Sequence, residues 1–186
     1  MLKIYFIFIV FFSFLNISFA ETAITRIEVK DNAYNVAFNG VFTISNIVLK
    51  EKNGEYDIVF PVYASKGKVY AQFGILKRNF RKDLAKALKE MRESDEHFET
   101  SFAINKFSLS KKGGNIKAFA SVIFNDDIEV ECRVMDGKNG LWVAWPSSKT
   151  DGKWRQNFEF TDKTVKNGVE SLLIKEYTKK LNNENR

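Results

Sequence analysis

The feature that most constrains the fold is a pattern that occurs twice along the chain. Asn53-Gly54 and Pro61 in the first half correspond to Asn139-Gly140 and Pro146 in the second, and these are the only two prolines of the 186 residues. Self-similarity at a fixed spacing is the signature of repeated structural units. The pattern therefore predicts two copies of one unit, with the same elements in the same order.

Apolar positions extend this correspondence over most of the chain after residue 20. The set that opens the first half recurs 80 residues later: Ile24, Ile27 and Val29 against Ile104, Phe107 and Leu109. A set at helical spacing recurs 85 residues later: Phe80, Leu84 and Leu88 against Val165, Val169 and Leu173. Gly67 corresponds to Gly152 in the same way. An internal duplication accounts for all of these matches.

Each copy is expected to form strands followed by a helix. Asn39-Gly40 between two apolar runs is the strongest short signal for a β-hairpin, and 125–127 takes the equivalent turn. Asp162 or Thr161 is the expected N-cap of the second helix. Helices are predicted over about 76–91 and 164–181, and further strands at 56–62, 68–73, 141–145 and 153–160. The sequence thus predicts an α+β fold, in which each unit is an antiparallel β-sheet followed by a C-terminal helix.

Residues 1–20 have the pattern of a secretory signal. A basic start at 1–3 precedes an apolar run, and Ser18-Phe19-Ala20 ends the segment with small residues where a signal peptidase reads them. The apolar run spans about twelve residues, whereas a bilayer span needs about twenty. We therefore expect cleavage near Ala20 and export to the periplasm or the extracellular space. The alternative is an uncleaved segment that anchors the protein in the membrane.

The expected organisation after this signal is two units joined by a charged connection. The connection contains His97, the only histidine. The predicted parts are a signal peptide (1–20), a first unit (21–91), a linker (92–100), a second unit (101–181) and a polar tail (182–186).

The most specific sequence motif lies in the second unit. Residues 133–147 read RVMDGKNGLWVAWPS, and 151–155 read DGKWR after a short basic turn. This run resembles the SpoVG family of septation proteins (stage V sporulation protein G), which carry a segment close to R-V-I-D-G-x-N-G-L-F-V-A-M-P-S, a basic turn and D-G-x-F-R. The closing helix contains Lys175-Glu176-Tyr177, like the acidic-Tyr ending of the family. The resemblance covers about 104–180, and the first unit is similar only in its skeleton.

The resemblance implies a small domain that pairs through its sheet into a homodimer and binds DNA or RNA, with regulatory roles in septation and sporulation. Two fused copies would form that dimer within one chain, as an intramolecular pseudo-dimer. Three departures stand against a simple transfer of function. The basic turn has only Lys149 and is one residue shorter than the usual turn of the family, P-S-K-R-T-P-D-G. Residues 156–160 stand where the family often has a His-Pro pair. An export signal precedes the first unit, whereas members of the family are cytoplasmic.

No motif in the sequence predicts an enzyme. His97 has no Ser or Cys partner at a recognisable spacing, and there is no His/Cys cluster for a metal and no Gly-rich phosphate loop. Asp126 and Asp127 lie in an expected turn, where Asp is favoured. Cys132 alternates onto the apolar face of its strand, as a buried inert thiol does. We therefore expect no catalysis, no cofactor, no metal site and no small-molecule substrate.

Basic residues supply the candidates for binding a polyanion. The net charge of +6 and the pI of about 9.3 permit an anionic partner without requiring one. In the second unit the candidates occupy the positions of the basic loop and strand of the SpoVG family: Arg133, Lys149, Lys153 and Arg155. In the first unit they lie on the helix: Arg78, Arg81 and Lys82, with Lys77, Lys86 and Lys89 beside them. The helix could lie along phosphates or anionic lipid; the alternative is an ordinary solvated face.

The tryptophans of the chain all lie within 140–154. Strand alternation puts Trp142 and Trp145 on opposite faces of a strand that is apolar on both sides, and such strands are normally buried on both. Trp142, Trp145 and Pro146 are therefore predicted to be core or interface residues, with a stacking platform as the alternative for the tryptophans. Trp154 follows the basic turn directly and is the better candidate for an exposed aromatic.

Two hypotheses for function follow. The first is an exported, non-enzymatic SpoVG-like protein that binds nucleic acid or another polyanion. The second is an exported structural or protein-interaction module that keeps the fold without binding nucleic acid. Self-association through the sheets fits either hypothesis. Contact with a membrane is expected only through residues 1–20, if they are not cleaved.

Overall fold

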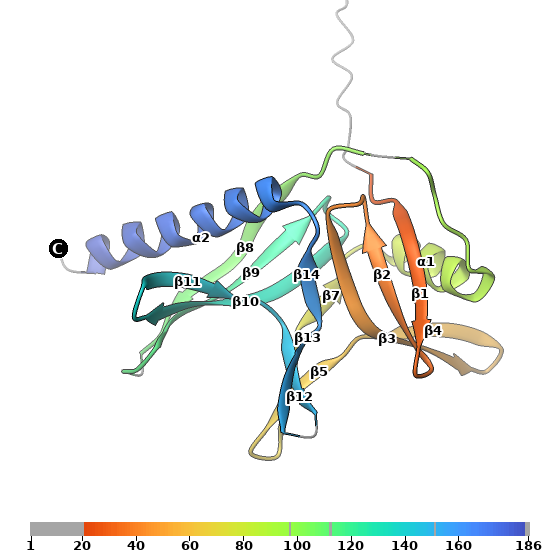
Figure 1. Cartoon of the computed structure of the whole chain (residues 1–186), viewed down its shortest axis with the longest axis horizontal. Helices are drawn as coiled ribbons and strands as arrows, with labels where there is room; N and C mark the ends of the chain where they lie inside the picture. Colours follow the sequence, from red (N-terminus) through yellow and green to blue (C-terminus); the bar gives the residue numbers. More distant parts are fainter. Residues whose placement is uncertain (1–20, 97, 112, 151, 185–186) are drawn as a thin grey trace, which may run out of the picture.

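A computed structural model of the chain describes residues 21–96, 98–111, 113–150 and 152–184 (Figure 1). The first half contains β1 (Ile24–Lys30), β2 (Ala33–Phe38), β3 (Phe42–Lys52), β4 (Glu55–Val59), β5 (Val62–Ser65), β6 (Lys68–Ala71), β7 (Phe73–Ile75) and α1 (Arg78–Glu90). The second half contains β8 (Phe102–Leu109), β9 (Ile116–Phe124), β10 (Ile128–Gly137), β11 (Gly140–Ala144), β12 (Ser147–Thr150), β13 (Lys153–Gln156), β14 (Phe158–Phe160) and α2 (Lys163–Glu184). The predicted α+β class is confirmed. The predicted signal segment and His97 lie outside the described residues.

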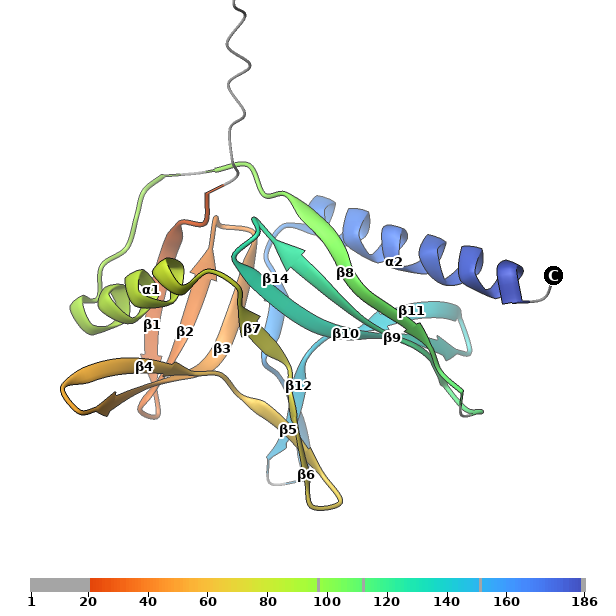
Figure 2. The ribbon, with the colours of Figure 1, turned by 180° about the vertical axis from the view of Figure 1, so that it is seen from behind.

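The two halves exchange their last strands. In one sheet the order is β1-β2-β3, and both β4 and β14 pair with β3; in the other the order is β8-β9-β10, and both β11 and β7 pair with β10. Figures 1 and 2 show the two sheets next to each other, with α1 along one and α2 along the other. This arrangement is consistent with two units packed as a pseudo-dimer. The duplication and the domain boundaries stay predictions.

The registers of the two exchanged strands match. All exchanged pairs are antiparallel: Phe158↔Ile44, Glu159↔Thr43 and Phe160↔Phe42 in one sheet, and Phe73↔Val130, Gly74↔Glu129 and Ile75↔Ile128 in the other. Each exchanged strand therefore covers the start of the longest strand of the opposite half, where an open edge would expose unpaired backbone groups.

A buried polar residue precedes each exchanged strand. The carbonyl of Gln72 accepts the N–H of Glu131, and the carbonyl of Asn157 accepts the N–H of Ser45, both at 2.9 Å. The two side chains also meet, because Nδ2 of Asn157 donates to Oε1 of Gln72 at 3.4 Å. Buried amides of this kind are costly unless bonded. The sequence predicted one continuous strand at 68–73 and at 153–160, whereas the chain changes partner at these two residues.

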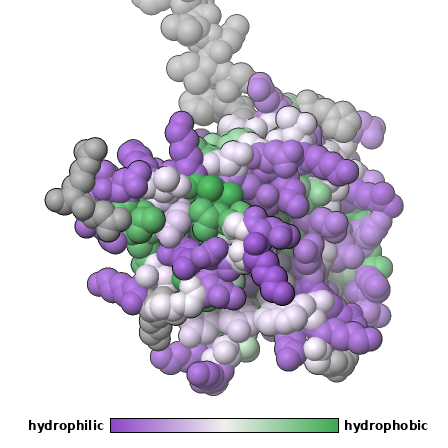
Figure 3. Space-filling model, turned by 60° about the vertical axis from the view of Figure 1, so that its left-hand side comes forward, coloured by the Kyte–Doolittle hydropathy of each residue, from purple (hydrophilic) through white to green (hydrophobic). Residues whose placement is uncertain are grey.

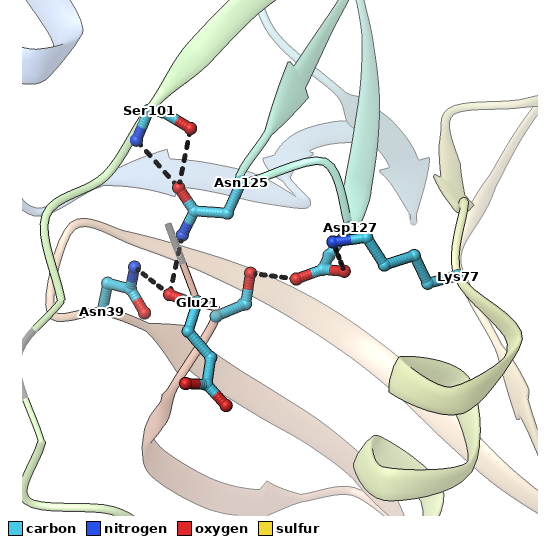
Figure 4. Close-up of polar contacts among 7 residues, drawn as sticks. Glu21, Asn39, Lys77, Ser101, Asn125 and Asp127 are labelled. Carbon is cyan, nitrogen blue, oxygen red and sulfur yellow. Dashed lines mark hydrogen bonds and ion pairs between the residues drawn. The ribbon is translucent and has the colours of Figure 1, made fainter. Parts of the chain in front are cut away.

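Two asparagine turns join the halves at the end of the sheets where the exchanged strands finish (Figure 4). Asn39 and Asn125 have φ values of 52° and 50°, which Asn tolerates better than most residues. Oδ1 of Asn39 accepts the N–H of Ala23 at 2.6 Å, and Oδ1 of Asn125 accepts the N–H of Ser101 at 2.8 Å. Both side-chain amides donate to one acceptor, the carbonyl of Glu21, at 3.2 and 3.1 Å.

The hydrophobic core is continuous through both halves. Rings from the two sheets meet where Phe42 lies 4.7 Å from Phe124 and 5.3 Å from Phe158, between ring centroids. Leu84 of α1 and Leu173 of α2 are fully buried in the same cluster. Each helix thus packs on one face of a sheet, and the exchanged strands join the two sheets.

Local sequence signals predicted the helices closely. The helix predicted over 76–91 is α1, and the helix predicted over 164–181 is α2. The predicted cap is confirmed: Oδ1 of Asp162 accepts the N–H groups of Thr164 and Val165, at 2.7 and 3.0 Å. Ile27 pairs with Val36, and Ile104 pairs with Val122 at the matching place in the other sheet. Ile27 therefore corresponds to Ile104, and the 80-residue offset between the opening strands, which matched Ile27 with Phe107, was wrong. Bulges in β1 and β8 shift that spacing.

The surface drawn in Figure 3 is mostly hydrophilic, with a hydrophobic patch left of centre and smaller hydrophobic spots elsewhere. Within the described ranges, no helix combines the length and the apolar character that a membrane span requires.

Candidate functional site

The most prominent feature outside the two sheets is a pair of hairpins that pack against each other. One is β5–β6 from the first half and the other is β12–β13 from the second. Strands β5 and β12 are in contact, and the rings of Tyr63 and Trp154 stack with centroids 6.2 Å apart at an interplanar angle of 20°. Figures 1 and 2 show both hairpins extending beyond the sheets on the same side of the molecule. We call this pair of hairpins the stalk.

The stalk carries five exposed basic residues. Each hairpin contributes its own: Lys66 and Lys68 from the first, and Lys149, Lys153 and Arg155 from the second. None of these cations takes part in the ion pairs found among the described residues. Gly67 and Gly152, with φ values of 73° and 77°, allow the two tight turns. Asp151, at the second turn, lies outside the described residues.

Sequence reasoning named the basic residues of the second hairpin and missed those of the first. The signal was present, because the predicted correspondence of Gly67 with Gly152 also aligns Lys68 with Lys153. The structure brings the two hairpins together, so that residues 85 positions apart in the sequence belong to one surface.

A cleft of about 1170 Å³ lies between the stalk and the open face of the second sheet. Its walls include Tyr63 and Tyr70 from the first hairpin, Trp154 from the second, and Phe119 and Trp142 from the sheet. Both halves of the chain therefore build this cleft.

Arg133, a predicted site residue, lies in the cleft rather than at the hairpin turns. Its guanidinium stands 5.2 Å from the centroid of Tyr63, within the range of a cation–π contact. Arg133 comes from β10 and Tyr63 from β5, so this contact joins the sheet to the stalk. Beside it, burial raises the pKa of Glu131, whose carboxylate also lines the cleft.

Of the two roles expected for Trp142, core or interface residue, the first was wrong. Its side chain is 50% exposed, whereas Val143, the next residue along β11, is buried. β11 is the edge strand of its sheet, and α2 packs on the face that carries Val143. The opposite face lines the open cleft, so Trp142 is accessible to a ligand. Pro146 is buried, and Trp145 packs on the core with its ring 5.1 Å from that of Phe158.

The two tryptophans of this segment should therefore differ in their effect on stability. Trp142→Ala is expected to change the free energy of unfolding by about 0.5 kcal/mol or less, as at most exposed positions. Trp145→Ala should cost about 3 kcal/mol, because it removes the contact with Phe158 and the hydrogen bond from Nε1 to Glu170 (2.9 Å). Urea denaturation of both variants checks this prediction, and equal losses would contradict it.

The basic residues of α1 are partly engaged within the molecule. Arg81, a predicted site residue, pairs with Asp57 at 2.6 Å and donates to the carbonyl of Ile58. Lys77 pairs with Asp127 at 3.0 Å, and Lys89 stands 4.3 Å from the ring centroid of Tyr56. The cations of α1 for which the described residues hold no such contact are Arg78, Lys82 and Lys86. Figures 1 and 2 show α1 along the first sheet, away from the stalk, so the structure does not bring the basic residues of the helix together with those of the stalk.

The polar groups elsewhere serve the fold. Asp127 accepts a hydrogen bond from Thr22 at 2.8 Å and pairs with Lys77 in the junction of Figure 4. Cys132 is buried, as predicted, and burial raises its thiol pKa to about 12. Among the residues that the structure describes, no three His, Cys, Asp or Glu side chains form a group that could hold a metal ion.

Comparison with known proteins identifies the second half. The model of the SpoVG family matches residues 100–179. Proteins named as SpoVG septation proteins from Archaeoglobus fulgidus and Clostridium acetobutylicum are 33% and 34% identical to the chain over 70 and 73 residues. These matches cover 37% and 38% of this chain, and 82% and 77% of those relatives. A third, from a Thermoanaerobacter species, is 35% identical over 68 residues, which cover 36% of this chain and 74% of that protein.

No solved structure gives a significant match. The family match contains β8 to β14 and most of α2, with the second hairpin of the stalk inside it. On these matches, the chain belongs to the SpoVG family.

Proposed function

We propose that this protein is a non-enzymatic, exported member of its family that binds an anionic polymer, nucleic acid in the first place, through the basic residues of the stalk. The observation that carries the proposal is the packing of the two hairpins. It concentrates five cations from both halves of the chain on one projecting surface. Such a surface matches a row of phosphates better than cations scattered over a sheet.

The turn of the second hairpin has fewer basic residues than the resemblance to the SpoVG family leads one to expect. The first hairpin makes up for the missing charge, because Lys66 and Lys68 lie at the neighbouring turn. Lysine and arginine side chains bind phosphate without requiring a particular base sequence. The proposed contact is therefore electrostatic and salt-dependent.

Export is part of the proposal. The packed structure includes the first residues after the expected cleavage site: the carbonyl of Glu21 accepts two hydrogen bonds, and Ala23 is buried. Cleavage after Ala20 would leave all of these contacts in place. The anionic polymer would then be one that occurs outside the cytoplasmic membrane.

Removing the lysines of the stalk tests the proposal. If all five cations neutralise phosphates, the logarithm of the binding constant should fall with the logarithm of salt concentration at a slope between roughly −3.5 and −4.5. Replacement of four lysines by alanine (Lys66, Lys68, Lys149 and Lys153) should make that slope shallower by roughly 3. Fluorescence anisotropy with a labelled oligonucleotide at several salt concentrations measures both values.

The matched control removes charge from the helix instead. Arg78→Ala combined with Lys82→Ala should leave the salt slope nearly unchanged, because those residues lie on a different surface. If the control loses affinity and the stalk variant does not, the binding surface is α1. If the wild-type protein binds no polyanion at low salt, the protein-interaction hypothesis takes its place.

A further inference from the structure

The cleft beside the stalk has aromatic walls that the fold leaves accessible. Trp154 is 61% exposed, Tyr70 is 47% exposed and Phe119 is 44% exposed. Together with Trp142 they present ring surfaces from the stalk and from the second sheet to one open space. Large aromatic rings normally bury most of their area, so this grouping indicates that a ligand covers them.

The charges of the cleft differ from those at the turns of the stalk. Its charged lining residues are balanced, three acidic and three basic: Glu131, Glu159 and Glu170 against Arg133, Arg155 and Lys166. A balanced lining gives no net attraction for phosphate groups. It does supply donors and acceptors, including the exposed Gln156, for the edges of an uncharged planar ring.

The contacts already present in the cleft show the mode of binding that it favours. Tyr63 stacks on Trp154 and also meets the guanidinium of Arg133. The exposed part of Trp154 can accept a further ring in the same way. Ring stacking and Arg contacts of this kind are typical of proteins that bind single-stranded nucleic acid.

We propose that the cleft binds the unpaired bases of a single-stranded nucleic acid whose phosphates lie along the basic residues of the stalk. This inference rests on the proposed function and adds to it a preference for single strands. The bases stack on Trp154 and Trp142, and the charged and amide groups of the cleft bond to their edges. A duplex reaches only the basic residues, because its bases are already paired and stacked inside the helix.

The test compares three probes of equal length on the full chain: an oligodeoxythymidine, an abasic oligodeoxyribose phosphate and a blunt duplex. The oligodeoxythymidine should bind at least about fivefold more tightly than the abasic strand for each base that stacks. It should also quench the fluorescence of the exposed tryptophans, whereas the abasic strand should not. Tighter binding of the duplex than of the single strand would overturn the inference.

Two variants separate the bases from the phosphates. Trp142→Ala, outside the stalk, should reduce the difference between the base-bearing and abasic strands, and leave the affinity for the abasic strand unchanged. Leu181→Ala, which truncates an exposed apolar residue near the C-terminal end of α2, is the control and should retain the difference. Circular dichroism verifies that each variant is folded.

The outcomes distinguish this inference from the proposed function. Binding of all three probes with equal affinity and a steep salt dependence would support the proposed function and overturn the inference. The inference would also be overturned if Trp142→Ala kept the full preference for the base-bearing strand. Failure of all three probes to bind at low salt would overturn both.

Discussion

Residues 100–186, produced without the first half of the chain, are expected to form a homodimer. In the whole chain, β7 covers the start of β10, and β14 leaves its own half to pair with β3. Removal of the first half leaves that part of β10 with unpaired backbone groups and takes away the sheet against which β14 packs. Two copies can repair both defects if each gives its β14 to the β10 of the other. Sedimentation equilibrium measures the expected mass.

The stability of this fragment should depend on its concentration, since the folded state exists only as the dimer. The matched control is the whole chain with a protease site inserted after Asp95. Cleavage there should leave the two halves associated, because the exchanged strands and the shared core hold them together. A folded, monomeric fragment at micromolar concentration, as stable as the whole chain, would contradict this prediction.

Features set by a few neighbouring residues could be predicted from the sequence. Asn39-Gly40 gave a hairpin, the periodicity of 76–91 gave α1, and Asp162 gave the cap of α2. Each depends on turn chemistry or on one face of one element. The strand exchange depends on partners far away in the sequence. The alternation of 68–73 is the same whether the chain continues along one sheet or crosses to another, so the change at Gln72 could not be predicted.

The exposure of Trp142 shows a second limit. The strand β11 is apolar on both faces, and the sequence does not reveal that its sheet ends there. The turn before it also differs from its counterpart: Gly137 pairs with Gly140 around 138–139, whereas Lys52 pairs with Glu55 around 53–54. A shift of one residue changes which side chains face the helix. The matching Asn-Gly pairs therefore do not occupy equivalent places in the two turns.

The candidate site was predictable only in part, for the same reason. The basic residues Lys149, Lys153 and Arg155 follow from the SpoVG motif, which is local. Tyr63 and Lys68 join them because the two hairpins pack, and hairpin packing depends on the fold of the whole chain. Residues from the two halves become visible as one group only when both halves are placed.

Phe158→Ala is expected to lower the free energy of unfolding by about 3–5 kcal/mol. Phe158 is buried in β14, with ring centroids at 5.3 Å from Phe42, 5.1 Å from Trp145 and 4.9 Å from Phe160. Its loss opens a cavity at the junction, where neighbours from both sheets cannot collapse without moving a strand. The matched control is Phe119→Ala, an exposed phenylalanine on β9, which should change stability by about 0.5 kcal/mol or less.

Urea denaturation followed by fluorescence and by circular dichroism measures both effects. Because Phe42 and Phe124 bring the two halves into one core around Phe158, the variant should still unfold in a single transition, at a lower urea concentration and with an unchanged slope. Two separate transitions would contradict a shared core and would mean that each half folds independently. An effect as small as that of Phe119→Ala would contradict the packing of β14 against the first sheet, on which the placement of the stalk also depends.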